Sequence, residues 1–109
     1  MKYVVDIENY TNDLFELNSD NVLTLKVYDS KNELQKDCHV EMFLTKNAML
    51  GLGTELIRLA HDFHEGKHFH LDPCEKDLIG QKMGVYVEPS SSSLVISCDK
   101  NQKIDDILK

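Results

Sequence analysis

The spacing of hydrophobic residues changes near the middle of the chain. In residues 22–28 apolar and polar positions alternate, as they do in a strand with one buried face, and residues 38–45 alternate in the same way. In residues 49–63 the apolar positions instead recur every three or four residues, which predicts an amphipathic helix of about 17 residues. Thr45 or Asn47 can cap the start of this helix.

Four further segments have the composition of short strands. Residues 3–8 predict a first strand, and residues 67–72, 83–88 and 93–98 predict three strands after the helix. Residues 89–93 are rich in serine and begin with proline, which is typical of a tight connection. We therefore expect the last two strands to form a hairpin.

This order of elements predicts an α+β fold. Strands precede and follow one long helix, and a single crossover helix cannot connect a parallel sheet. We expect an antiparallel sheet of about five to six strands with one long amphipathic helix packed on one face. Residues 1–109 should form a single domain with one modest core. Gly66 should end the helix in a left-handed conformation, and residues 104–108 should form a last helical turn.

The sheet face opposite the helix is a candidate for binding another protein. If the apolar positions of each strand face the helix, the other positions carry aromatic, histidine and carboxylate side chains. Aromatic anchors are enriched among the residues that dominate protein interfaces. The alternative is a solvated face without a partner, which is normal in antiparallel sheets. The predicted partner-binding face consists of Tyr28, His39, Glu41, Phe43, His68, His70, Asp72, Tyr86 and Glu88.

Four of the five histidines lie in residues 61–70, so metal binding is an alternative function. His68 and His70 are two apart on a predicted strand and share a side, and Asp72 continues this spacing. Imidazole and carboxylate groups bind transition metals, so these three residues form the alternative metal site. The sequence has no recognised metal motif such as H-E-x-x-H. Our first expectation is therefore no metal, no cofactor and no catalytic residue.

The net charge narrows the range of partners. The chain has 12 basic and 19 acidic residues, a formal charge of −7. This charge disfavours nucleic acid and anionic membranes, which need clustered Lys and Arg, and it suits a basic protein. No apolar run reaches membrane-spanning length. Cys38, Cys74 and Cys98 are odd in number and lack C-x-x-C spacing, which indicates reduced thiols in a cytoplasmic protein.

Parts of the second half resemble a known family. The first three segments are Asn47-Ala48-Met49-Leu50-Gly51-Leu52, Leu56-Ile57-Arg58-Leu59-Ala60 and Gly66-Lys67-His68-Phe69-His70-Leu71-Asp72. Together with Ser91-Ser92-Ser93-Leu94-Val95-Ile96 they resemble the bacterial immunity-protein family numbered thirty-two, small α+β proteins of polymorphic toxin systems. The resemblance implies a non-catalytic protein that neutralises a cognate toxin by binding it, and the acidic charge favours a basic toxin. A homodimer that pairs two open faces is compatible with either function.

Overall fold

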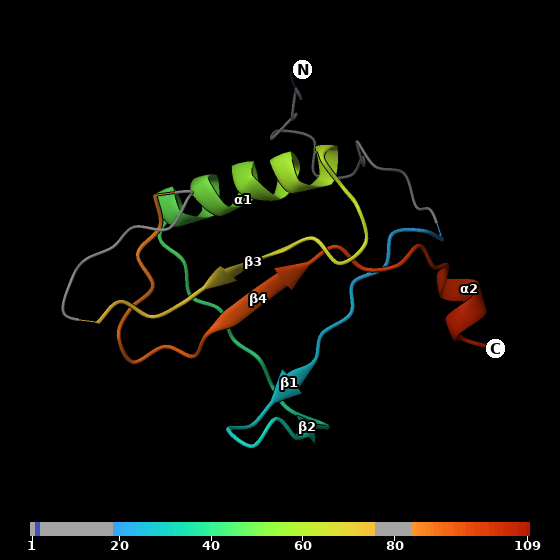
Figure 1. The fold of residues 1–109 in the computed structure, drawn as a ribbon, viewed down its shortest axis with the longest axis horizontal. Helices are drawn as coiled ribbons and strands as arrows, with labels where there is room; N and C mark the ends of the chain where they lie inside the picture. The colour runs from blue at the N-terminus through green and yellow to red at the C-terminus, as the bar shows by residue number, and fades with distance from the viewer. Residues whose placement is uncertain (1, 3–18, 76–83) are drawn as a thin grey trace. The chain divides into compact units, whose positions relative to one another are not determined.

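The computed structural model describes residue 2, residues 19–75 and residues 84–109. The chain divides into two compact units. Unit 1 consists of Met1–Cys38 and Asn101–Lys109, and unit 2 is His39–Lys100. The helices and strands in chain order are β1 (Val27–Tyr28), β2 (Leu34–Gln35), α1 (Lys46–His61), β3 (His68–Leu71), β4 (Leu94–Ser97) and α2 (Ile104–Ile107) (Figure 1).

The prediction of one sheet with five to six strands is wrong. The described residues form two antiparallel sheets of two strands each, β1 with β2 and β3 with β4. Residues 38–45 and 84–88 belong to no strand, although their sequences alternate. The physical reason is that alternation reports one-sided burial, whereas a strand also needs a neighbour to receive its backbone hydrogen bonds. The predicted strand at residues 3–8 lies outside the described residues, as does residue 83.

The hairpin of β1 and β2 belongs to unit 1 and was not predicted. Its turn is organised by Asp29, because Oδ1 accepts the backbone N–H groups of Lys31 and Glu33 at 2.8 and 2.9 Å. The other oxygen, Oδ2, accepts Nε2 of Gln35 at 2.9 Å. Asn32 adopts a positive φ of 61° in this turn, a conformation that asparagine tolerates well. The paired residues are Val27 with Gln35 and Tyr28 with Leu34.

Helix α1 confirms the predicted helix and its cap. It has 16 residues, and Oγ1 of Thr45 accepts the N–H of Ala48 at 3.2 Å, which satisfies one of the unpaired donors of the first turn. The helix ends at His61. Gly66 therefore does not end it as predicted; its φ of 84° lies in the turn that leads into β3, where the N–H of Lys67 donates to the carbonyl of His64 at 3.1 Å.

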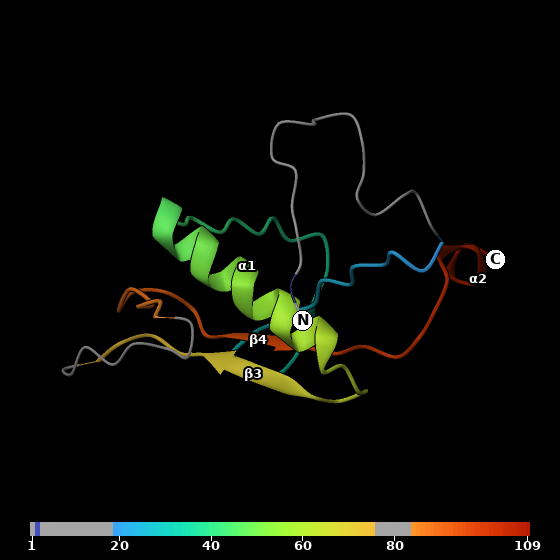
Figure 2. The same cartoon turned by 90° about the horizontal axis from the view of Figure 1, so that it is seen from above.

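Strands β3 and β4 lie side by side as an antiparallel pair (Figure 2). Both occupy segments where strands were predicted, but the predicted hairpin between residues 83–88 and 93–98 is wrong, because β4 pairs with β3. The N–H of Cys98 donates to the carbonyl of Lys67 at 2.7 Å and extends the ladder by one step. The paired residues are His68 with Ser97, Phe69 with Ile96, His70 with Val95 and Leu71 with Leu94.

The buried residues of the described part of the chain all belong to unit 2. Among the described residues they are Leu52, Leu71, Cys74 and Cys98. On α1 the covered edge runs through Ala48, Leu52 and Leu59, which are buried or half-buried. The neighbouring apolar edge of the same helix is exposed, so the amphipathic stripe is wider than the surface that covers it. This uncovered helix edge consists of Met49, Leu50, Leu56 and Ile57, and Phe63, just after the helix, is also exposed.

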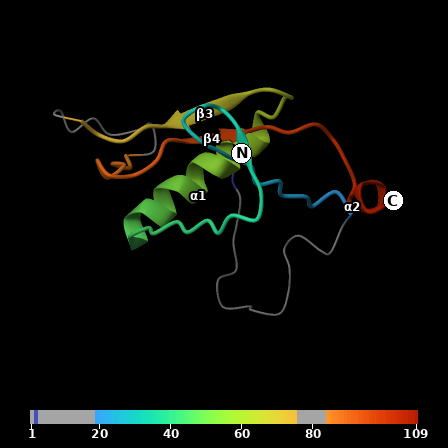
Figure 3. The same ribbon diagram turned by 90° about the horizontal axis from the view of Figure 1, so that it is seen from below.

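Helix α2 confirms the predicted final helical turn (Figure 3). It is anchored within unit 1, because the N–H of Ile104 donates to the carbonyl of Ser19 at 2.9 Å. Asp105 and Asp106 occupy its first turn, where negative charge interacts favourably with the helix dipole.

Candidate functional site

The antiparallel pair of β3 and β4 has one polar face and one apolar face. His68 and His70 are exposed, while Phe69 is half-buried and Leu71 is buried. Directly paired residues of an antiparallel ladder point to the same side, so β4 adds Val95 and Ser97 to the polar face. We call this surface the β3–β4 face, and it consists of His68, His70, Val95 and Ser97.

The two histidines of the β3–β4 face are in contact. Their ring centroids are 5.1 Å apart, and the rings meet edge to face at 80°. Nδ1 of His68 lies 2.8 Å from the carbonyl oxygen of Gly66. A carbonyl can only accept, so Nδ1 carries the proton and donates it. In the neutral ring this leaves the lone pair on Nε2 of His68.

The segment before α1 carries a second contact of the predicted partner-binding face. Nε2 of His39 and Oε1 of Glu41 are 2.9 Å apart. Both side chains are exposed, so this contact contributes little to stability. Phe43 is 88% exposed, and within residues 38–45 only Leu44 is half-buried. The predicted division of this segment into an inner and an outer face is therefore wrong.

Glu88 begins a local turn that overlaps the tight connection predicted for residues 89–93. Its Oε1 accepts the N–H and the hydroxyl of Ser90 at 2.9 and 2.7 Å, and these hydrogen bonds hold the pKa of the Glu88 carboxyl below its ordinary value. The N–H of Ser91 donates to the carbonyl of Glu88 at 2.9 Å. Pro89 occupies the second position of this turn, where proline is favoured, and this was the signal available in the sequence.

The remaining residues of the predicted face are placed as follows. Tyr86 is 61% exposed in unit 2, and Asp72 is exposed just after β3. Tyr28 lies on β1 in unit 1 and is 55% exposed. The structure thus brings together two pairs of the predicted residues, the histidines of β3 and the pair of His39 and Glu41 before α1. The prediction that all nine residues bind one partner stays a prediction.

An ion pair lies between the end of α1 and the start of β3. Nζ of Lys67 donates to the side-chain carboxylate of Asp62, and it lies 3.4 Å from the backbone carbonyl oxygen of the same residue. This hydrogen bond and the positive charge of Lys67 hold the pKa of Asp62 below its ordinary value. The two residues are five apart across the end of a helix. Sequence periodicity gives no signal for such a pair, because the contact depends on how the chain turns after the helix.

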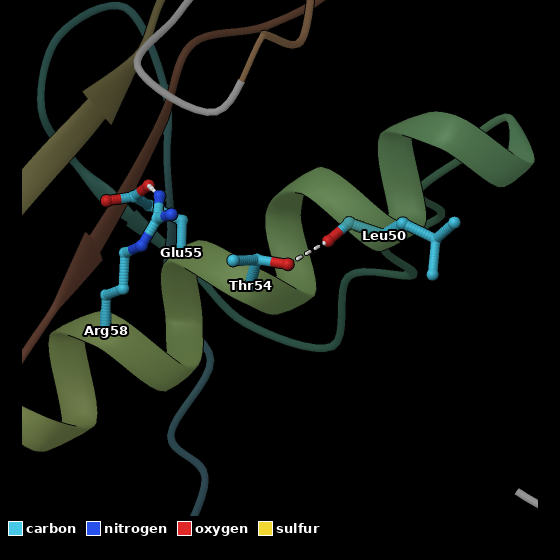
Figure 4. A network of polar contacts seen from close by, with 4 residues as sticks. All are labelled: Leu50, Thr54, Glu55 and Arg58. Carbon is cyan, nitrogen blue, oxygen red and sulfur yellow. Dashed lines mark hydrogen bonds and ion pairs between the residues drawn. The ribbon is translucent and has the colours of Figure 1, made fainter. Parts of the chain in front are cut away.

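Two polar side-chain contacts on α1 lie within the helix (Figure 4). The hydroxyl of Thr54 donates to the carbonyl of Leu50 at 2.7 Å, and Nη1 of Arg58 donates to Oε2 of Glu55 at 3.2 Å. The first contact satisfies a hydroxyl in mid-helix, and the second is a pair three residues apart that stabilises a helix by a few tenths of a kcal/mol, about 0.2–0.5. These contacts explain helix stability rather than chemistry.

Two further findings concern the described part of the chain. Within residues 19–75 and 84–109, no three side chains of the His, Cys, Asp and Glu types gather closely enough to hold a metal ion. The predicted trio of His68, His70 and Asp72 is therefore not a three-donor cluster. In the same ranges no helix is long and apolar enough to cross a bilayer.

No family model, curated protein or solved structure matches this chain.

Proposed function

We propose that this protein is a non-catalytic binding protein of the cytoplasm that neutralises a cognate bacterial toxin by direct contact. The observation that carries the proposal is the exposure of large aromatic side chains in unit 2. Phe43 is 88% exposed and Tyr86 is 61% exposed. Aromatic residues provide much of the binding energy of protein interfaces once a partner removes them from water, so both side chains are suitable anchors.

The uncovered helix edge supports the same proposal. Met49 and Leu50 are 57% and 63% exposed, and they follow closely after Phe43 in the chain. Exposed apolar surface of this kind marks interaction sites when it is extensive. An amphipathic helix that offers apolar residues at helical spacing is also a common recognition element. The proposed contact surface of unit 2 therefore includes the start of α1.

The charge of the chain favours a basic partner. With a formal charge of −7, the protein attracts positively charged proteins over distances comparable to the Debye length, about 8–10 Å at moderate salt. Such steering raises the association rate, while aromatic anchors mainly lower the dissociation rate. A toxin whose active site binds a polyanion, such as a nuclease, has the required surface.

The toxin as partner rests on the resemblance of four short segments to the immunity family. In that reading the protein performs no reaction, and it blocks the active site of the toxin or another surface that the toxin needs. This accounts for an acidic chain with exposed aromatic residues.

The test is co-expression with the product of the adjacent upstream gene. We expect the two proteins to co-purify and the growth of cells that express the toxin-like protein to be rescued. No complex and no rescue would reject the toxin as partner.

Once a complex is in hand, single substitutions test the contact surface. Phe43→Ala and Tyr86→Ala should each weaken binding by about thirtyfold, since truncating an aromatic anchor costs about 2 kcal/mol. Leu108→Ala is the control, because this residue is 78% exposed and lies outside the predicted face. All three variants should unfold at the same urea concentration as the unmodified protein. Unchanged affinity for both aromatic variants would reject the proposed surface even if the complex exists.

A further inference from the structure

We propose that His68 and His70 form a two-donor site for a divalent transition-metal ion of the Cu²⁺, Ni²⁺ and Zn²⁺ class. Both residues are exposed on β3, on the same side of the strand. The proposal goes beyond protein binding and does not depend on it. It also differs from the three-residue site expected from the sequence, because Asp72 is not required.

The spacing of the two side chains suits chelation of one ion. Alternate residues of a strand are about 7 Å apart along the backbone, and an imidazole nitrogen binds these metals at about 2.0–2.1 Å. The rings of His68 and His70 already touch, with centroids 5.1 Å apart. Since His70 is exposed, rotation about its side-chain bonds can aim one of its ring nitrogens at an ion on Nε2 of His68, while the hydrogen bond from His68 to Gly66 stays in place.

The hydrogen bond of His68 prepares this ring as a ligand. Metal-binding histidines commonly donate their second ring nitrogen to a carbonyl, which sets the tautomer and the ring orientation. Nδ1 of His68 donates to the carbonyl of Gly66 at 2.8 Å. Gly66 is itself held, because its N–H donates to the carbonyl of Cys98 at 3.0 Å. The backbone therefore presents Nε2 of His68 to solvent with its lone pair available.

The surroundings of the pair favour a cation of intermediate softness. On the β3–β4 face the residues paired with His68 and His70 are Ser97 and Val95, which carry no charge. Lys67 is adjacent in sequence, but its ammonium is paired with Asp62. Imidazole donors select Cu²⁺, Ni²⁺ and Zn²⁺ over Mg²⁺ and Ca²⁺, which prefer oxygen ligands. Water would complete the coordination of the bound ion.

The test is calorimetric titration of the untagged full chain with Zn²⁺, Ni²⁺ and Cu²⁺. We expect one saturable site per chain, the tightest binding for Cu²⁺, and no binding of Mg²⁺. His68→Ala and His70→Ala should each lower the affinity by about tenfold or more, because each removes one of two donors. His39→Ala and Cys38→Ser are the controls, since both residues are exposed potential ligands elsewhere, and they should bind as the unmodified chain does.

Three results would overturn the proposal. They are the absence of saturable binding, unchanged affinity in both histidine variants, and loss of binding in either control. Imidazole ¹⁵N NMR of the unmodified chain with Zn²⁺ provides a test that needs no variant, with coordination expected through Nε2 of His68. Coordination through Nδ1 of that ring, or unperturbed signals for both histidines, would contradict the geometry. None of these readouts involves the toxin, so failure of the metal site and failure of the proposed function are distinguishable.

Discussion

Replacing Leu52 by alanine tests which edge of α1 is packed. Leu52 is 8% exposed, whereas Leu50, two residues earlier in the same helix, is 63% exposed. The two positions allow an identical substitution with nearly identical effects on helix propensity, because Leu and Ala are both strong helix formers. The difference between Leu52→Ala and Leu50→Ala therefore measures burial.

The expected magnitudes follow from these exposures. Leu→Ala at a buried position costs about 2–5 kcal/mol, and the value is lower where the surroundings can collapse into the cavity. The described part of the chain buries only three residues besides Leu52, so we expect about 2–3 kcal/mol for this position. Leu50→Ala should change the free energy of unfolding by about 0.5 kcal/mol or less, as is usual for surface positions.

Urea and thermal unfolding followed by far-UV circular dichroism can measure both variants, since the chain has no tryptophan. A loss of about 2 kcal/mol corresponds to a fall in Tm of roughly 10 °C for a chain of this size. Equal destabilisation by the two substitutions, or a larger effect of Leu50→Ala, would show that the packed edge of the helix has been assigned wrongly.

Three further predictions concern single contacts. Thr45→Ala should lower the free energy of unfolding by about 1 kcal/mol, because the first turn of α1 loses its side-chain cap; an unchanged urea midpoint would show that the cap does not matter. Gly66→Ala should lower the free energy of unfolding by about 1–2 kcal/mol because Gly66 has a positive φ. Gly53→Ala should raise it by about 0.5–1 kcal/mol, because Gly53 lies in mid-helix and an added Cβ there meets nothing. Effects of the same sign would refute this contrast. The lowered pKa of Asp62 means that its pair with Lys67 stabilises the fold above the unfolded-state pKa and that this contribution is lost as the pH falls through the folded-state pKa. Carboxyl ¹³C titration should show the low pKa, Lys67→Met should raise it, and an identical titration in the two proteins would exclude the ion pair.

The elements that could be predicted from the sequence are those that depend on near neighbours. Thr45 and the apolar spacing after it specify α1 locally, and the alternation around His68 locates β3. Residues 38–45 show the limit of this reasoning. Their alternation is as regular as that of β3, but no described segment supplies them with ladder hydrogen bonds, and such a partner cannot be identified from periodicity alone.

The candidate site divides in the same way. That His68 and His70 share a face follows from the two-residue period of any strand. His68 donates to the carbonyl of Gly66. The position of this carbonyl depends on the turn between α1 and β3, whereas the sequence pattern predicts Gly66 as the end of the helix. The exposure of Phe43 likewise depends on which segments cover it, and that information is not local.

The pairing of Leu71 with Leu94 has a consequence for folding kinetics. Helix α1 forms through contacts between near neighbours, on a timescale of about 0.1–1 μs for an isolated helix of this size. The β3–β4 ladder must instead close a long connection, and non-local pairing of this kind slows folding. Loop-closure entropy grows slowly with length, since doubling the connection adds only about 0.6 kcal/mol. Insertions between the strands should therefore be tolerated, whereas a slip of one residue in β3 would turn His68 and His70 away from solvent.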